Sequence, residues 1–287
     1  MNRFFLLVTL LFTYLSTLSA KEYTFPFSND QIDVVIPCVE KDLLTVNLCI
    51  QGIRENGANI RRIIVVSSKQ FTSEAEWFDE SHYPFSFQDV ATALAKDDPS
   101  LTKELLREGS RAGWYYQQLL KLYAPLVIPD ISPNVLVLDA DTIFLNPVRF
   151  LNDHNGGMYN PGWEYYLPYF QHAAYLIPGF YKCFHDYSGI SHHMIFQRPV
   201  IELLLKEVEN QYQAPFWKTF CLLVDPNELF RSGASEYEIY FNYLFARTDQ
   251  ASIRLLEWSN IERMSEIEGF KKRGFHYVSL HSYNRRD

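Results

Sequence analysis

The sequence predicts an α/β protein with a mostly parallel central sheet flanked by helices. Three apolar runs, within residues 32–37, 62–68 and 134–138, lack the polar alternation of a half-exposed strand. Such runs are typical of strands that are buried on both faces of a parallel sheet. Helical patterns separate the runs, and the order strand, helix, strand favours right-handed parallel crossovers.

Length and composition are those of one globular domain. The chain has 287 residues, of which 47% are hydrophobic and 21% charged, so it can bury a substantial core. We expect a single domain with two lobes. The formal net charge is −8, and the only basic run is the short one at residues 271–273, which argues against nucleic acid as a partner. The four cysteines form no C-x-x-C pair, so buried thiols are favoured and disulfide pairing stays open.

The N-terminus has the pattern of an export signal. Arg3 precedes an apolar run over residues 4–18, and the small residues Ser19 and Ala20 follow. The run is shorter than the roughly 20 residues of a membrane span. Residues 1–20 are therefore predicted to be a signal peptide or a short signal anchor, and residues 21–287 the folded domain. This predicts an exported or secretory-lumen protein that touches a membrane only through that anchor.

The first half holds the most regular elements. The strand at residues 32–37 is stopped by Pro37. Asp42 is expected to cap a helix that ends near Asn56 and Gly57. Residues 71–109 are polar and mixed, which predicts short helices and loops. A helix over residues 114–126 leads into the strand at 134–138.

The second half, residues 149–287, is less regular and is expected to face a second substrate. An amphipathic helix is predicted near residues 200–210 and another over residues 236–245. Ser235 is a plausible N-cap of the latter, and Glu238 stands at its capping-box position.

Two carboxylates follow the third strand, at Asp139 and Asp141. Side chains at positions i and i+2 of an extended strand point the same way, so the two acids could face one ligand. Hard oxygen donors at the carboxyl end of a sheet strand suit Mg²⁺ or Mn²⁺ carrying a phosphorylated ligand. The alternative is a pair of solvated acids after a strand.

Three segments together resemble GT-A glycosyltransferases, and the last two resemble the glycogenin-like branch in particular. They are Asp33-Val34-Val35-Ile36-Pro37, Leu119-Leu120-Lys121-Leu122 and Leu138-Asp139-Ala140-Asp141-Thr142. The resemblance covers residues 31–150 best. It implies a Rossmann-like GT-A fold, a nucleotide-sugar-binding half over residues 31–148, and an acceptor-side half over 149–287. It also implies a nucleotide-sugar donor, in particular a UDP-sugar, with Mn²⁺ or Mg²⁺, and a glycan, lipid or protein acceptor.

The resemblance assigns donor-side roles to residues of this chain. Asp141 would coordinate the metal directly, while Asp139 would bind it through water or hold the ribose. Lys121 would approach the donor phosphate or sugar; the alternative is a surface lysine whose stem covers apolar surface. His281, preferred over His276, would be the third metal ligand. The remaining donor-side candidates are Pro37, Cys38, Val39 and Glu40 at the end of the first strand, and Gln117 and Gln118 beside the lysine.

Acceptor-side roles follow in the same way. An inverting enzyme needs a carboxylate base, and Glu236 is the candidate; retaining relatives lack one, so the stereochemical outcome is open. Ser191, His192 and His193 would line the acceptor or donor sugar, and Glu238 is a further acceptor-side candidate. Two adjacent histidines of a strand cannot both face one ligand.

Two other function classes remain as alternatives. The D-x-D-x-T pattern at residues 139–142 also fits haloacid-dehalogenase-type phosphatases, although no later G-D-x-x-x-D acid pair follows. The other alternative is a degenerate, exported sugar-binding module. An export signal also conflicts with the use of a nucleotide-sugar donor, unless the protein works in an ER- or Golgi-like lumen.

Overall fold

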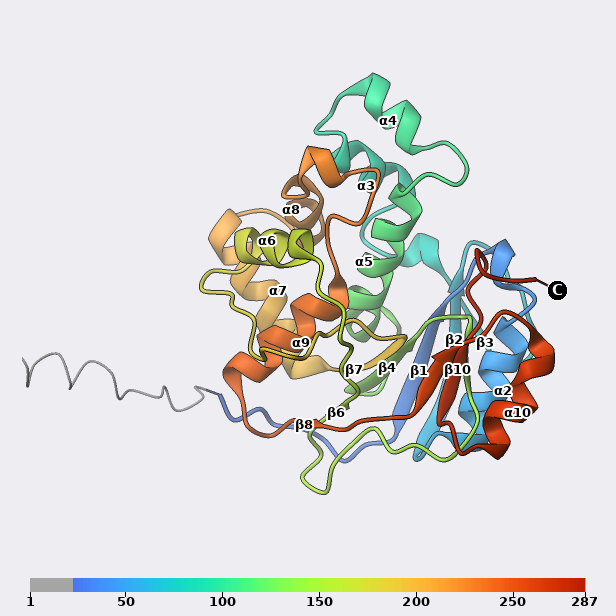
Figure 1. The fold of residues 1–287 in the computed structure, drawn as a ribbon. Coiled ribbons are helices and arrows are strands. Elements are labelled where there is room, and N and C mark those ends of the chain that lie inside the picture. Colours follow the sequence, from blue (N-terminus) through green and yellow to red (C-terminus); the bar gives the residue numbers. More distant parts are fainter. Residues whose placement is uncertain (1–22, 287) are drawn as a thin grey trace, which may run out of the picture.

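The computed structural model describes residues 23–286, so the predicted signal segment at 1–20 lies outside the described residues. A five-stranded sheet forms the centre, in the order β3-β2-β1-β4-β7 (Figure 1). The strands are β1 Ile32–Pro37, β2 Ile60–Ser67, β3 Glu76–Asp79, β4 Asn134–Leu138 and β7 His193–Gln197. The first four are parallel, and β7 runs antiparallel to β4. The predicted α/β class and mostly parallel sheet are confirmed.

Helices cover both faces of this sheet. Figure 1 shows α2 on one side and α5, α7 and α9 on the other, as right-handed crossovers in opposite directions require. The longer helices are α2 Val46–Asn56, α5 Ala112–Val127, α7 Arg198–Tyr212 and α9 Glu236–Arg247. The shorter ones are α3 Phe87–Leu94, α4 Pro99–Leu105, α6 Leu167–Leu176, α8 Phe216–Leu222 and α10 Ile267–Lys272, with single 3₁₀ turns at η1 Glu40–Asp42, η2 Glu80–His82, η3 Pro226–Glu228 and η4 Met264–Glu266. Among residues 23–286, no helix combines the length and apolarity needed to cross a bilayer.

The sheet contains a topological switch point between β1 and β4. The chain proceeds from β1 to β2 and β3 on one side, and then returns to place β4 against the other edge of β1. The crevice outside the carboxyl ends of such a strand pair is where open α/β sheets bind ligands. Here those ends are Pro37 of β1 and Leu138 of β4.

Two smaller sheets come from the later part of the chain. One has the order β5-β10-β9, formed by β5 Thr142–Phe144, β10 Tyr277–Ser279 and β9 Trp258–Asn260. The other pairs β6 Met158–Tyr159 with β8 Ser252–Ile253. The first of these sheets packs through Ile143, Val278 and Leu280 on residues of α2 and α10. It thus places the C-terminal segment beside the acidic sequence that follows β4.

Some local expectations were wrong. Asp42 does not cap α2, whose N-cap is Thr45 without a side-chain hydrogen bond; the Asp42 carboxylate accepts from the Val39 amide instead, within η1. The extended D-x-D geometry also fails, because the chain turns between β4 and β5, with the Thr142 amide donating to the Asp139 carbonyl. Residues 71–109 were expected to form short helices and loops, but they also include the edge strand β3, which pairs with β2.

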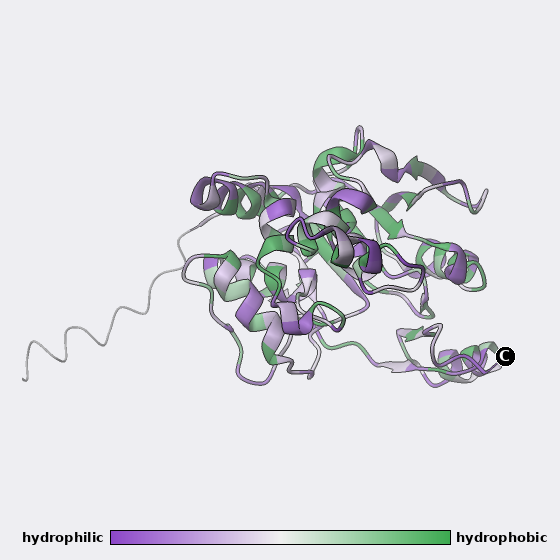
Figure 2. Cartoon of the chain, turned by 90° about the horizontal axis from the view of Figure 1, so that it is seen from above, coloured by the Kyte–Doolittle hydropathy of each residue, from purple (hydrophilic) through white to green (hydrophobic). Residues whose placement is uncertain are grey.

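The core follows the apolar runs of the sequence. The side chains of β1 and β4 are buried on both faces, including Val34, Val35, Leu136 and Val137. In Figure 2 the central strands are largely hydrophobic, whereas the outer helices alternate between hydrophobic and hydrophilic positions. One continuous apolar cluster therefore joins the sheet to the helices on its two faces.

Gly52 sets the spacing between α2 and β5. A Cβ at this position would lie 2.7 Å from the Phe144 carbonyl oxygen and 2.9 Å from its amide nitrogen. We expect Gly52→Ala to lower the free energy of unfolding by about 1–3 kcal/mol through overpacking, despite the gain in helix propensity. Gly113→Ala in α5 is the matched control, because nothing lies within 4 Å of its Cβ; it should stabilise by up to about 1 kcal/mol. Equal urea midpoints for the two variants would contradict this account.

Candidate active site

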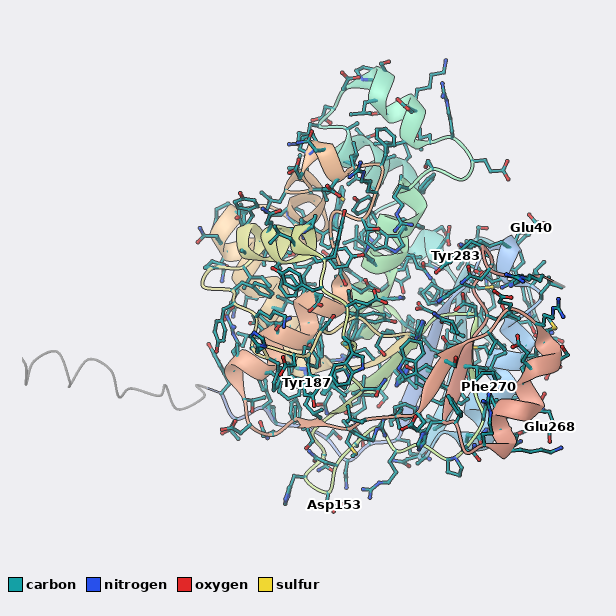
Figure 3. The ribbon with its side chains drawn as sticks, viewed as in Figure 1. Glu40, Asp153, Tyr187, Glu268, Phe270 and Tyr283 are labelled. Carbon is teal, nitrogen blue, oxygen red and sulfur yellow. The ribbon has the colours of Figure 1, made fainter. Side chains whose placement is uncertain are left out.

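The predicted acidic residues lie at the switch point. Asp139 directly follows β4, and Cys38 and Val39 directly follow β1. The buried Cys49 thiol of α2 donates to the Asp139 carbonyl at 3.6 Å, which ties α2 to the same turn. Glu40 and Tyr283, labelled in Figure 3, lie at this end of the molecule. Arg285 connects the C-terminal segment to the segment after β1 by donating to the Lys41 carbonyl and the Thr45 hydroxyl.

Lys121 is a buried cation held between two carboxylates. Its Nζ lies 2.6 Å from Oδ1 of Asp139 and 2.8 Å from Oε1 of Glu236. It also donates to the Tyr237 hydroxyl at 3.1 Å and lies 4.3 Å from the centre of that ring. The Lys121 side chain is only 4% exposed, whereas that of Asp139 is 25% exposed. Lys121 is therefore a buried group, and its partner Asp139 lies between it and the solvent.

The electrostatics keep Lys121 charged. Burial alone would lower the pKa of Lys121, but the nearby Asp139 and Glu236 carboxylates raise it well above its ordinary value. Burial raises the pKa of Glu236, and the charge of Lys121 opposes that rise. The α5 helix contributes Lys121 and the α9 helix contributes Glu236, so the ion pair also joins two helices across the site.

Strand register brings the C-terminal histidine to the acidic turn. In the β5–β10 pair, Ser279 stands opposite Thr142, and the Leu280 amide donates to the Asp141 carbonyl. The Ser279 hydroxyl consequently donates to Oδ1 of Asp141 at 3.1 Å, and Nδ1 of His281 lies 3.0 Å from Oδ2. Burial would raise the pKa of Asp141, but the hydrogen bond and charge of His281 lower it.

His192 completes the cluster from the strand on the other side of Asp139. Its carbonyl accepts from the Asp139 amide at 3.0 Å, just before the antiparallel pairing of β4 with β7 begins. Its Nε2 lies 3.3 Å from Nε2 of His281. Burial lowers the pKa of His192 to about 4, so this ring is neutral at pH 7. Burial alone would lower the pKa of His281, but the hydrogen bond and charge of Asp141 raise it.

Several predicted residues have positions that differ from the expected ones. Glu238 does not close a capping box: Ser235 caps α9 with its side chain, while the Glu238 carboxylate accepts from the Ser188 hydroxyl and the Gly189 and Asn242 nitrogens. His193 does not line a cleft, because it is buried and packs against the rings of Phe144, Phe150 and Tyr277. Two further candidates accept hydrogen bonds from backbone amides: Oε1 of Gln118 from Glu236, and Nδ1 of His276 from Glu257. The remaining candidates differ in exposure: Pro37 and Cys38 are buried, Gln117 and Ser191 are half-buried, and Val39 and Glu40 are exposed.

The structure adds residues that sequence reasoning missed. Tyr237 and Ser279 bind Lys121 and Asp141 directly. Tyr283, which is 79% exposed, stacks on His281 with ring centres 5.1 Å apart and planes 9° apart. Tyr237 and Ser279 each adjoin or nearly adjoin a predicted site residue in the sequence, which was an available signal. No sequence pattern pointed to the stacking of Tyr283.

The donor set suits a divalent cation without forming a complete cage. Carboxylates and imidazoles are the ordinary protein ligands of such ions, and the turn offers both kinds, with Asp141 and His281 in contact and Asp139 two residues before Asp141. Within residues 23–286, however, no three or more His, Cys, Asp or Glu side chains already converge as a metal-binding group. Any ion held here would need ligands from water or substrate as well.

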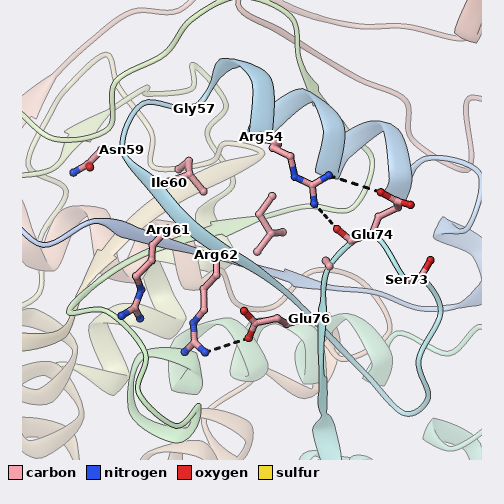
Figure 4. A pocket seen from close by; sticks show the side chains of 11 residues that line it. Arg54, Gly57, Asn59, Ile60, Arg61, Arg62, Ser73, Glu74 and Glu76 are labelled. Carbon is pink, nitrogen blue, oxygen red and sulfur yellow. Dashed lines mark hydrogen bonds and ion pairs between the residues drawn. The ribbon is translucent and has the colours of Figure 1, made fainter.

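A cavity away from this site lies at the other end of the sheet. It measures about 650 Å³ and lies by the amino end of β2 and the segment before β3, away from the switch point (Figure 4). Arg54 contacts Glu74 at 3.8 Å, and Arg62 contacts Glu76 at 3.2 Å. Arg61 also lines the cavity and pairs with the buried Asp33 behind it, so each arginine of the lining already has a carboxylate partner.

The fold and the site define an α/β protein with an acidic turn and a buried lysine at the switch point of its sheet. The chain belongs to DUF6492, described as a family of unknown function, whose profile matches residues 19–265. No curated protein sequence matches it. Among solved structures the chain is similar to apo mouse xyloside xylosyltransferase 1, with 10% sequence identity over 90% of this chain and 99% of that chain, and a TM-score of 0.40. A likeness this distant carries no functional argument.

Proposed function

We propose that this protein is a metal-dependent glycosyltransferase that moves a sugar from a nucleotide diphosphate, in particular a UDP-sugar, to a glycan, lipid or protein acceptor. The observation that supports it most is the joint position of Asp139, Asp141 and Lys121 at the switch point. Ligands with phosphate groups bind at this place in open α/β sheets. The export signal expected from the sequence would make it a lumenal or exported enzyme.

Each group has a role that follows from its position. The end of β1, from Pro37 to Glu40, borders the nucleotide. Departure of a sugar leaves a diphosphate whose growing charge must be stabilised by preorganised positive groups. Lys121 is such a group, because Asp139 and Glu236 keep it protonated and fixed. A divalent cation bound beside Asp139, Asp141 and His281 would add electrostatic stabilisation of the leaving diphosphate.

Glu236 is assigned to position Lys121 instead of serving as an acceptor base. Its side chain is only 5% exposed and is paired to Nζ of Lys121. A general base must reach the acceptor proton within hydrogen-bond distance, which a carboxylate turned into the interior does not do. The proposal therefore places Glu236 behind the lysine.

The test is hydrolysis of a panel of nucleotide sugars by the full chain, with Mn²⁺ present and absent. Asp139→Asn and Asp141→Asn should each lower turnover by about 10²–10³-fold, because each removes charge from the site. Asp153→Asn is the matched control, since Asp153 is an 86% exposed surface carboxylate paired with Arg149; it should keep wild-type turnover.

Other outcomes would reject the proposal. Wild-type turnover in both site variants would show that the acidic turn plays no part. Phosphate release from p-nitrophenyl phosphate, without a nucleotide sugar, would instead support the phosphatase alternative. Glycan binding that needs neither metal nor nucleotide, measured by calorimetry, would support the sugar-binding alternative.

A further inference from the structure

Two imidazole rings face each other at the acidic turn. Nε2 of His192 and Nε2 of His281 are 3.3 Å apart, and the ring centres are 5.2 Å apart. The residues are 89 positions apart in the sequence, so separate strand pairings hold them there. His192 is further enclosed by the Trp258 ring at 4.7 Å and the Tyr277 ring at 5.8 Å. Both rings thus have defined orientations.

Hydrogen bonding fixes which nitrogen of His281 is available. Nδ1 of His281 pairs with a carboxylate oxygen of Asp141, and a carboxylate only accepts, so Nδ1 carries a proton. The outward nitrogen of His281 is therefore Nε2, which points at His192. The Nδ1 atom of His192 is buried and has no hydrogen-bond partner among the described residues. The only polar contact of the His192 ring within this region is hence its Nε2 with His281.

The spacing of the two nitrogens matches that of two ligands on one ion. With metal–nitrogen bonds of about 2.0–2.1 Å, two imidazole nitrogens lie about 3.3–3.4 Å apart in a tetrahedral arrangement and about 2.9 Å apart at a right angle. A 3.3 Å separation falls within that span, and it is long for a hydrogen bond from an N–H group.

The surroundings of His281 are those of a supported metal ligand. Metal-binding histidines commonly donate their second ring N–H to a carboxylate, which fixes the ring and raises its basicity. Asp141 fills that place, and both of its oxygens are engaged, Oδ2 by His281 and Oδ1 by Ser279. Asp141 is therefore better placed to orient His281 than to coordinate an ion itself.

We propose that His192 and His281 together bind a divalent first-row transition ion through their Nε2 atoms, with Asp141 as the positioning residue of His281. Imidazole nitrogens favour such ions over Mg²⁺, which prefers oxygen ligands. Because the described residues contain no complete ligand cage, water and ligand oxygens occupy the other positions. The inference rests on the proposed function only in naming donor phosphates as those oxygens.

Titration of the full chain with Co²⁺ alone, followed by visible absorption and calorimetry, tests the pair. We expect the wild type to bind one Co²⁺, and His192→Gln, His281→Gln and Asp141→Asn each to weaken binding by about tenfold or more. Glutamine keeps a hydrogen-bonding group near the position of Nε2, so loss of the hydrogen bond alone does not explain the effect. His154→Gln, at an exposed loop histidine, should bind Co²⁺ as the wild type does. Far-UV circular dichroism checks that each variant is folded.

The outcomes separate this inference from the proposed function. Wild-type Co²⁺ affinity in folded His192→Gln, or equal displacement of Co²⁺ by Mg²⁺ and Mn²⁺, would overturn the histidine pair while leaving nucleotide-sugar hydrolysis untouched. Histidine-dependent Co²⁺ binding in a protein that hydrolyses no nucleotide sugar would support the pair and reject the glycosyltransferase.

Discussion

Replacing Lys121 by methionine is expected to lower the free energy of unfolding by about 3–5 kcal/mol. Removal of one partner from a buried ion pair leaves the other charge uncompensated in the interior. Here the loss would strand Glu236, whose side chain is 5% exposed, and remove the cation that neutralises Asp139. Urea unfolding followed by fluorescence gives the change in free energy.

A double-mutant cycle shows whether the effect comes from the stranded charge. Glu236→Gln in the Lys121→Met background removes the uncompensated carboxylate and should recover part of the lost stability. Strictly additive losses from the two substitutions would contradict the coupling. Lys272→Met is the matched control, because Lys272 and Glu268 form a surface pair whose side chains are 75% and 67% exposed. Such pairs contribute little, so the control should remain close to the wild type.

The burial of Lys121 could not be predicted from the residues that surround it in the sequence. The helix was predicted, but a lysine between leucines fits a snorkelling surface residue equally well. Only the packing of α9 against α5 decides between the two, since it brings Glu236 from 115 residues away. Helical periodicity describes each helix separately and does not show that α9 packs against α5.

Strands that carry the site were more accessible to sequence reasoning. The runs at residues 32–37 and 134–138 reappear as β1 and β4 with the predicted bounds. A strand buried on both faces has a simple signature, because every position must be apolar. The exception in β1 is Asp33, whose burial the apolar pattern did not anticipate.

The remainder of the site depends on register. Asp139 and Asp141 were expected to share one face of an extended strand, whereas the structure bends the chain between them and gives each acid its own partner, Lys121 or His281. His281 is brought to Asp141 by the pairing of β5 with β10, whereas Lys121 reaches Asp139 from helix α5. The strands β5 and β10 have three residues each, and a hydrophobic pattern this brief does not specify a register.

Asp33 is a second buried charge, at the opposite end of β1 from the site. Its side chain is fully buried. It accepts from Nε of Arg61 at 2.8 Å, from Nε of Arg62 at 3.2 Å and from the Ser132 amide at 2.8 Å. Burial alone would raise the pKa of Asp33, but the hydrogen bonds from Arg61, Ser132 and Arg62 lower it below its ordinary value. The ionised form therefore joins β1, β2 and the segment before β4.

Asp33→Asn should lower the free energy of unfolding by about 3 kcal/mol at pH 7, because it removes charge-assisted hydrogen bonds from the interior. Since the pKa of Asp33 is lower in the folded than in the unfolded chain, its contribution is fully present above about pH 4. It is lost as the pH falls through the folded-state pKa. Urea midpoints of wild type and variant should therefore differ by a constant amount from pH 7 down to about pH 4. Below about pH 4 this difference should become smaller. Asp153→Asn, at an exposed surface carboxylate, is the control and should leave the urea midpoint unchanged at pH 7. A difference between wild type and Asp33→Asn that stays the same in acid would refute the explanation by a buried carboxylate.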